Sequence, residues 1–156
     1  MIRRLIILLL IVGSLLEGSE VDKKSQHNIS IGMLDDKIGL SLIGYTYDVK
    51  LSEKKYFYLG GGTSLLVNTL SSGLKYYYIK SKFSIYSVFS LKRMYMGYIQ
   101  EYTGSELIDT ITASFSLEYN LSNKTHINLG AVGVLDDAEG SYEFWGYPFM
   151  GLNFRF

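Results

Sequence analysis

The chain has 156 residues, which suits a single domain, and equal numbers of basic and acidic residues give it a formal net charge of zero. This balance argues against a nucleic-acid-binding protein, because such proteins use basic patches to neutralise phosphates. The absence of cysteine excludes a disulfide framework and leaves the redox compartment open. Mean hydropathy is only mildly positive, as in a membrane β-barrel, where half of each strand faces away from lipid.

The first nineteen residues have the three-part pattern of a secretory signal peptide. Basic residues precede an apolar run at 5–12, and small and polar residues follow at 13–19. The apolar run is short for a membrane-spanning helix, which needs about 20 residues, so a single membrane anchor is the weaker alternative. We therefore predict a cleavable signal peptide at 1–19 and one domain at 20–156, which the following patterns identify as a β-barrel.

Alternation of apolar and polar residues predicts β-strands throughout this domain, because successive side chains of a strand point to opposite faces. The clearest run is 110–120, where Ile111, Phe115 and Leu117 alternate with serine, threonine and glutamate. We expect the apolar face to point outward to lipid and the polar face to point into a lumen. The eight predicted strands are 27–34, 38–49, 56–67, 82–91, 94–103, 110–120, 125–135 and 142–156.

Polar segments connect these strands. The predicted turns and loops are 35–37, 50–55, 92–93, 104–109, 121–124 and 136–141. The longest connection, 68–81, is either a loop or an extension of the two flanking strands. Its tyrosines at 76–78 fit an aromatic belt at the membrane interface better than an exposed binding surface.

Two acidic groups fall in connections that we place on the outside, at 35–37 and 136–141. Their carboxylates could hold calcium loosely, because calcium prefers oxygen ligands. Neither group forms a defined ligand loop, so we interpret both as solvated acidic tips. We predict no metal site and no cofactor.

The C-terminal segment 149–156 carries the most specific pattern of the chain. It alternates apolar with other residues, contains Gly151, and ends with Phe154 and Phe156 on one face. A soluble sheet rarely leaves such a terminal strand uncovered, because its edge would promote aggregation. A closed barrel in lipid requires such a strand, with its apolar side outward and both edges paired.

This segment resembles the C-terminal signal of bacterial outer-membrane β-barrels. The whole mature chain resembles the small eight-stranded class that includes the OmpA transmembrane domain and OmpX. The resemblance implies an all-β, eight-stranded antiparallel up-and-down barrel in the outer membrane of a Gram-negative cell, in contact with its lipid. It also implies that the barrel-assembly machinery reads Gly151, Phe154 and Phe156. We expect a monomer.

Four polar residues share the inward-facing parity near the periplasmic strand ends: Asp48, Glu118, His126 and Arg155. An eight-stranded barrel has a lumen that side chains fill, and a charge at membrane depth must face inward and be matched. We therefore predict a buried polar cluster in which Arg155 pairs with Glu118 or Asp48. This favours a structural plug over a small ion gate.

A structural or surface-interaction role, adhesin-like and acting through the loops, is the function that we expect. A lipid A-modifying enzyme is the main alternative. The deacylase family that it would resemble has a serine two residues after its histidine, whereas Asn128 follows His126 here, so we expect no catalytic activity. A lipocalin-like periplasmic carrier is a weaker alternative, because it needs the inverse of the pattern at 110–120.

Overall fold

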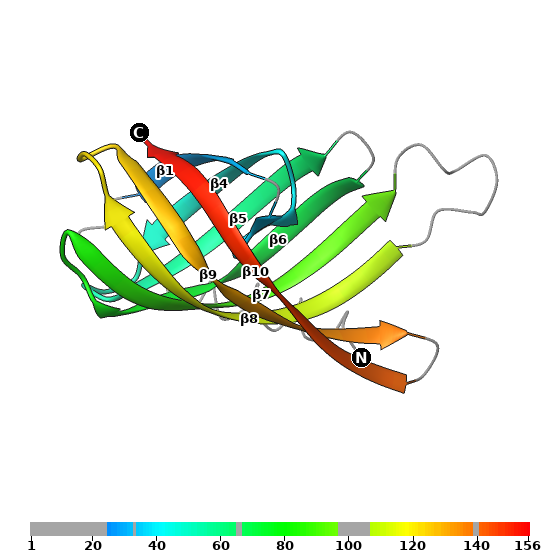
Figure 1. Cartoon of the computed structure of the whole chain (residues 1–156). Coiled ribbons are helices and arrows are strands. Elements are labelled where there is room, and N and C mark those ends of the chain that lie inside the picture. The colour runs from blue at the N-terminus through cyan, green and yellow to red at the C-terminus, as the bar shows by residue number, and fades with distance from the viewer. Residues whose placement is uncertain (1–24, 33, 65–66, 97–106, 139–140) are drawn as a thin grey trace.

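The computed structural model describes residues 25–32, 34–64, 67–96, 107–138 and 141–156 (Figure 1). The long strands are β1 (Ser25–Ile31), β4 (Ile43–Lys50), β5 (Lys55–Ser64), β6 (Val67–Ile79), β7 (Phe83–Met96), β8 (Leu107–Asn120), β9 (Thr125–Ala138) and β10 (Ser141–Arg155). Two short strands, β2 (Leu34–Asp35) and β3 (Gly39–Leu40), lie between β1 and β4. The predicted signal peptide lies outside the described residues. Within the described residues, no helix is long and apolar enough to cross a membrane.

The eight long strands close into one barrel in the order β1-β10-β9-β8-β7-β6-β5-β4. Every neighbouring pair is antiparallel, and β1 completes the ring by pairing with both β4 and β10. Chain neighbours are also sheet neighbours, as in an up-and-down barrel. The predicted fold class is confirmed.

The wall of the barrel is apolar outside and polar inside. On β8, the side chain of Phe115 is 58% exposed, whereas Ser116 and Glu118 are 0% and 2% exposed. The same alternation follows β5, where Leu59 is exposed and Tyr58 is fully buried. This orientation suits contact with lipid and is the reverse of the one that a soluble carrier needs.

One predicted connection is a strand and another lies inside a strand, and the two differences cancel in the strand count. Residues 67–79 form β6, so the strand-extension interpretation of 68–81 is the correct one. Residues 92–93 lie inside β7 instead of in a turn, because Lys92 points into the lumen while Arg93 points outward. The two adjacent basic residues fit inside a strand because each has a partner on its own face: Lys92 binds the Asp36 carbonyl in the lumen, and Arg93 binds Asp109 on the outside.

The tyrosines of β6 divide between the two faces of the wall. Tyr76 and Tyr78 are exposed on the outside and contact each other, with ring centroids 5.1 Å apart. Tyr77 is 3% exposed and points into the lumen. Two of the three thus occupy positions that suit the predicted aromatic belt, and the third belongs to the interior.

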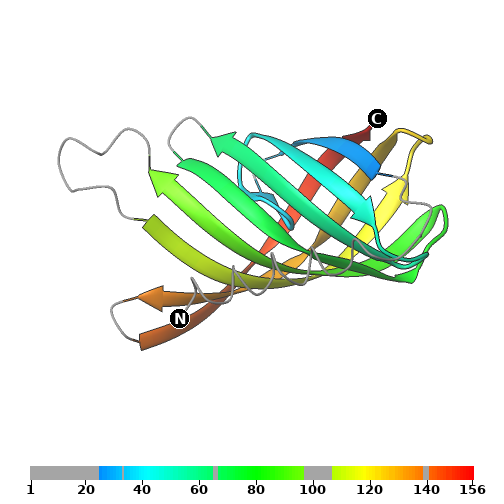
Figure 2. The same cartoon turned by 180° about the vertical axis from the view of Figure 1, so that it is seen from behind.

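One end of the barrel is level and the other slopes (Figures 1 and 2). The level end carries the turns 51–54, 80–82 and 121–124, and short turns of outer-membrane barrels face the periplasm. Strand length grows around the ring, from 7 residues in β1 and 8 in β4 to 14 in β9 and 15 in β10. Because β1 pairs with β10 only up to Leu152, residues 141–151 of β10 continue beyond β1 on the outer side.

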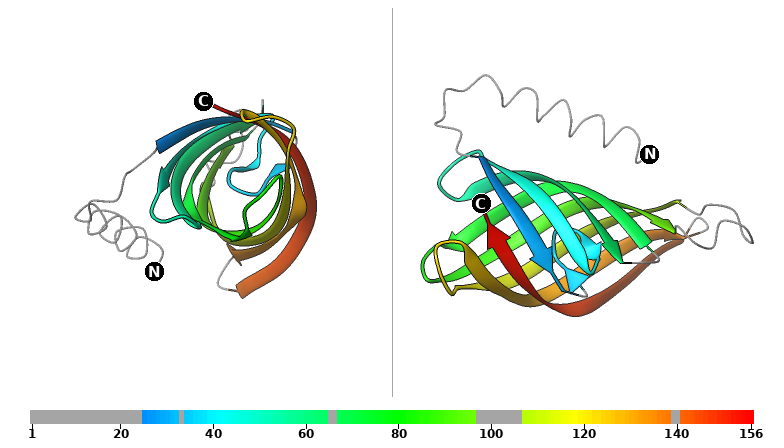
Figure 3. Two further views of the ribbon diagram at one scale, coloured as in Figure 1. Left: turned by 90° about the vertical axis from the view of Figure 1, so that its left-hand side faces the viewer. Right: turned by 90° about the horizontal axis from the view of Figure 1, so that it is seen from above.

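The connection between β1 and β4 enters the barrel instead of turning outside it. We call residues 34–42, which contain β2 and β3, the inserted segment; it lies within the ring of strands (Figure 3). Gly39 has φ +92°, a conformation that favours glycine and lets the segment reverse. The exposed turn predicted at 35–37 is therefore wrong: Asp36 is 1% and Lys37 is 8% exposed.

Candidate functional site in the lumen

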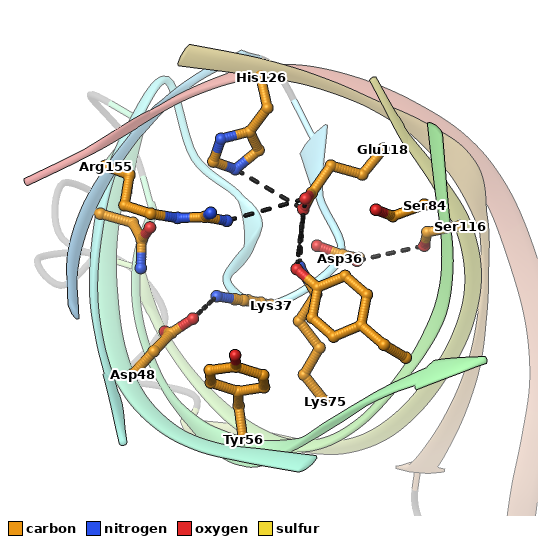
Figure 4. Close-up of polar contacts among 12 residues, drawn as sticks. Asp36, Lys37, Asp48, Tyr56, Lys75, Ser84, Ser116, Glu118, His126 and Arg155 are labelled. Atoms are coloured by element: carbon orange, nitrogen blue, oxygen red, sulfur yellow. Dashed lines mark hydrogen bonds and ion pairs between the residues drawn. The ribbon is translucent and has the colours of Figure 1, made fainter. Parts of the chain in front are cut away.

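Glu118 is the centre of a buried network near the periplasmic end of the lumen. Its carboxylate accepts a hydrogen bond from the Lys75 ammonium at 3.0 Å and from the Tyr77 hydroxyl at 3.1 Å. His126 Nε2 lies 3.8 Å and the Arg155 guanidinium 3.7 Å from the same carboxylate. Four side chains from β6, β9 and β10 thus converge on one residue of β8 (Figure 4).

Lys75 is held by aromatic rings as well as by Glu118. Its ammonium lies 3.7 Å from the centroid of the Tyr86 ring and 4.5 Å from that of Tyr77. A desolvated cation gains more from an aromatic face than an exposed one does. The side chains of Lys75 and Glu118 are both 3% exposed, so each charge depends on the other for compensation.

The four predicted lumen residues divide into two groups. Glu118, His126 and Arg155 come together, and Arg155 takes the first of its two predicted partners. Asp48 instead binds the Lys37 ammonium at 2.5 Å, on the inserted segment. The sequence reasoning missed Lys37 and Lys75 because both were placed in connections, where a lysine carries no signal of a lumen position.

Three side chains of the wall hold the tip of the inserted segment. The Tyr58 hydroxyl donates to the Lys37 carbonyl at 3.0 Å, and the Lys92 ammonium donates to the Asp36 carbonyl at 3.0 Å. The Ser116 hydroxyl donates to the Asp36 carboxylate at 3.2 Å. Strands β5, β7 and β8 therefore all anchor the same short stretch.

The inserted segment also fixes its own turn. The Asp35 carboxylate accepts hydrogen bonds from the backbone N–H groups of Lys37 at 2.8 Å and Ile38 at 3.0 Å. This is the pattern by which an aspartate stabilises a tight turn. Asp36, which lies in this segment and not in a spanning strand, has its pKa raised by burial and by the adjacent Asp35 carboxylate.

Ile38 anchors the segment by apolar contact. It is fully buried, and its methyl groups lie where side chains of two wall residues, Gly44 and Gly62, would be. A Cβ on Gly44 would lie 2.2 Å, and one on Gly62 2.6 Å, from Ile38 atoms. Leu34 packs on a second apolar cluster in the lumen, formed by Val132, Val134 and Phe149.

Carboxylates and cations occur in equal number among the described side chains that face the lumen. The carboxylates are Asp35, Asp36, Asp48 and Glu118, and the cations are Lys37, Lys75, Lys92 and Arg155. Equal numbers of opposite charges lower the cost of placing them in a poorly hydrated interior.

His126 contacts Glu118, and no hydrogen bond joins it to a serine among the described residues. Ser116, which faces inward on the adjacent strand, donates to Asp36. Among the described residues, no three His, Cys, Asp or Glu side chains are grouped so that they could hold a metal ion.

No protein-family model and no curated protein matches the sequence. The structure is similar to the N-terminal β-barrel domain of Pseudomonas aeruginosa OprF, with a TM-score of 0.56 and 14% identity over 85% of this chain and 95% of that one. It is also similar to Neisserial surface protein A, with a TM-score of 0.50 and 9% identity over 85% of this chain and 93% of the other.

The chain has the fold of the small outer-membrane β-barrels. At these identities the comparison concerns the fold alone. The fold and the apolar outer surface agree with the outer-membrane location and the lipid contact predicted from the sequence. The roles of Gly151, Phe154 and Phe156 in assembly stay a prediction; Phe154 pairs with Ile29, so this segment forms the closing seam of the barrel.

Proposed function

We propose that this protein is a monomeric, non-conducting outer-membrane barrel with a structural role, which contacts its surroundings through its outer end. One observation carries the proposal: the inserted segment occupies the lumen and is anchored to the wall by the Lys37–Asp48 ion pair and the Lys92–Asp36 hydrogen bond. An eight-stranded barrel already has a narrow lumen, and this segment fills part of it.

Planar-bilayer recording tests the closed lumen. The wild-type protein is expected to give no conductance steps. Replacing residues 35–38 with Gly-Ser-Gly-Ser removes the ion pair, the carboxylates and Ile38, so we expect conductance to appear. A matched control replaces 51–54, the turn at the periplasmic end, with the same four residues and should stay silent. Steady conductance by the wild-type protein would contradict the proposal.

The surface role is supported by the shape of the outer end. Strands β9 and β10 continue beyond β1 and carry Phe144, which is 78% exposed, and Trp145, which is 46% exposed. Exposed aromatic side chains are frequent anchors at protein interfaces. Proteoliposomes that carry the protein should adhere to cultured animal cells more than empty ones do, and Phe144→Ser should reduce this adhesion. Equal adhesion of empty and loaded proteoliposomes would refute the adhesin-like role.

We also propose that the protein has no catalytic activity and that the barrel-assembly machinery inserts it through the C-terminal segment. Lipid A extracted from cells with and without the protein should have the same acyl pattern in mass spectrometry. Phe156→Ala should lower the fraction that shows heat-modifiable gel mobility, whereas Phe83→Ala, at another exposed phenylalanine near the same end, should not. An altered acyl pattern would instead favour the lipid A-modifying enzyme.

A further inference from the structure

The outside of the barrel carries an ion pair where the wall faces lipid. Arg93 of β7 lies directly across from Asp109 of β8. The Arg93 guanidinium donates to both carboxylate oxygens of Asp109, from Nε and from Nη2, each at 2.6 Å. Both residues have the outward parity, since Lys92, one residue away, reaches the inserted segment in the lumen.

An apolar groove of about 370 Å³ lies beside this pair, on the outer surface of β5 to β8. Its apolar lining includes Phe57, Leu59, Leu70, Leu91 and Ile111. Its volume falls within the range of about 300–1,000 Å³ that is usual for ligand pockets.

A small residue makes room for this groove. Ser72 of β6 pairs with Leu59 on one side and with Leu91 on the other, so a short side chain stands between two long ones. The groove is therefore a local depression in a wall whose outward residues are mostly large. It is shaped for a slender apolar group.

The ion pair lies at the outer end of the groove. Arg93 is three residues from the end of β7 at Met96, and Asp109 is two residues from the start of β8 at Leu107. At about 3.3 Å per residue, both lie within about 10 Å of the outer strand ends. A charge on the lipid side costs least near the interface, where lipid headgroups lie.

We propose that this groove and Arg93 bind one acylated, phosphate-bearing lipid of the outer leaflet. An acyl chain lies along the groove over Ser72, and a headgroup phosphate accepts hydrogen bonds from Arg93. A guanidinium has five N–H donors in a planar fork, and Asp109 takes two of them. Asp109 holds the guanidinium at the mouth of the groove, and its own charge moderates the affinity for phosphate. The occupant is an amphiphile because the site joins an apolar groove to a cation.

Native mass spectrometry of the full mature protein in detergent tests the proposal with three probes. Dimyristoyl phosphatidic acid carries both the chains and the phosphate, dimyristoylglycerol carries the chains alone, and inorganic phosphate carries the anion alone. We expect retention of phosphatidic acid about tenfold above that of the diacylglycerol, since charge-assisted hydrogen bonds add that much affinity. Inorganic phosphate at the same concentration should not displace the lipid.

Variants separate lipid binding from a merely structural ion pair. Arg93→Gln should lower phosphatidic acid retention about tenfold, and Ser72→Leu, which fills the groove with an apolar side chain, should lower it to a similar degree. Asp109→Asn should retain the lipid as well as the wild type does, or better, because it removes a competing carboxylate. Lys82→Gln removes an outward cation at the periplasmic end and serves as the control.

Heat-modifiable gel mobility shows whether each variant is folded before its lipid is measured. Equal losses of phosphatidic acid retention in Arg93→Gln and Asp109→Asn would overturn the proposal, because the ion pair would then only stabilise the barrel wall. Equal retention of phosphatidic acid and dimyristoylglycerol would also overturn it. Displacement by inorganic phosphate would show that the site takes the anion alone, which likewise contradicts an amphiphile.

Discussion

The two halves of the lumen are filled in different ways. Near the periplasmic end, side chains of the strands themselves meet around Glu118, and all its partners project from the wall. Farther toward the outer end, the inserted segment supplies Asp36 and Ile38. Side chains of the wall hydrogen-bond to Asp36, and two wall glycines leave room for Ile38. The periplasmic half is filled by side chains whose position in a strand points them inward. The outer half is filled by a connection that turns into the barrel.

This difference follows from the sloping outer end. Strand β1 ends at Ile31, so the chain leaves the wall while the neighbouring part of β10 continues. A connection that starts low on the wall needs only a few residues to reach the middle of the lumen. The shortness of β1 and β4 therefore explains why the segment between them can lie in the lumen.

The largest expected effect concerns the periplasmic half. Glu118→Gln leaves the Lys75 ammonium buried without its carboxylate, so the free energy of unfolding should fall by about 3–5 kcal/mol. Urea titration in lipid vesicles, followed by the fluorescence of Trp145, measures it. The control Glu143→Gln, at an exposed position on β10, should change nothing. The double variant Lys75→Met with Glu118→Leu should recover most of the loss, and failure to recover would show that the other partners of Glu118 dominate.

A smaller effect is expected where the inserted segment is tied to the wall. Asp48→Asn weakens the bond to Lys37, and we expect a loss of about 2 kcal/mol in the same titration. The inserted segment should also leave the lumen more often, which bilayer recording would detect as brief openings. A variant as silent and as stable as the wild type would show that Lys92 and Tyr58 hold the segment without this pair.

Steric displacement of Ile38 should have a comparable or smaller effect. In Gly62→Ala the new methyl group would lie 2.6 Å from Ile38 and 2.7 Å from Ser41, which costs about 1–3 kcal/mol in a packed core. The matched control is Gly61→Ala on the same strand, whose new methyl group points outward with its nearest neighbours at 3.4 Å. Equal stability of the two variants would mean that Ile38 can shift away from the new methyl group without lowering the free energy of unfolding.

The smallest effect is expected outside the lumen, at the turn between β4 and β5. A hydrogen bond from Lys50 lowers the pKa of Glu53, which is fully exposed. A lowered pKa contributes stability above the ordinary pKa of glutamate, and the contribution disappears as the pH falls through the lowered value. Water and salt screen such a pair, so Glu53→Gln should leave the urea midpoint unchanged at neutral pH. A clear loss at neutral pH that vanishes in acid would contradict this expectation.

The alternation of residues predicted which face of each recognised strand points outward. The two faces of β8 are predicted correctly because the polarity of each side chain indicates the face on which it lies. The turn at 121–124 follows from the point where this alternation stops. The same parity placed Glu118, His126 and Arg155 on the inside, where the structure brings both His126 and Arg155 within 3.8 Å of the Glu118 carboxylate. Parity carries no information on contacts between distant strands, so Lys75 was missed as the main partner of Glu118.

The connections were the weak part of the prediction. Lysines at 75 and 92 looked like turn residues because a charged side chain is usually solvated, yet each is compensated inside the barrel by groups far away in the chain. The acidic pair at 35–36 looked like an exposed tip for the same reason. Its burial depends on Lys92 and Ser116, which are 56 and 80 residues away from Asp36.

By itself, the sequence determined a barrel wall of β-strands, its apolar outer face and the polar character of its interior, because these properties follow from local alternation. Only the tertiary structure decided that the β1–β4 connection fills the lumen, that Asp48 serves this segment, and that Arg93 meets Asp109 on the lipid side. Those features need ring closure at a particular register, which places distant residues together and which no short stretch of sequence encodes.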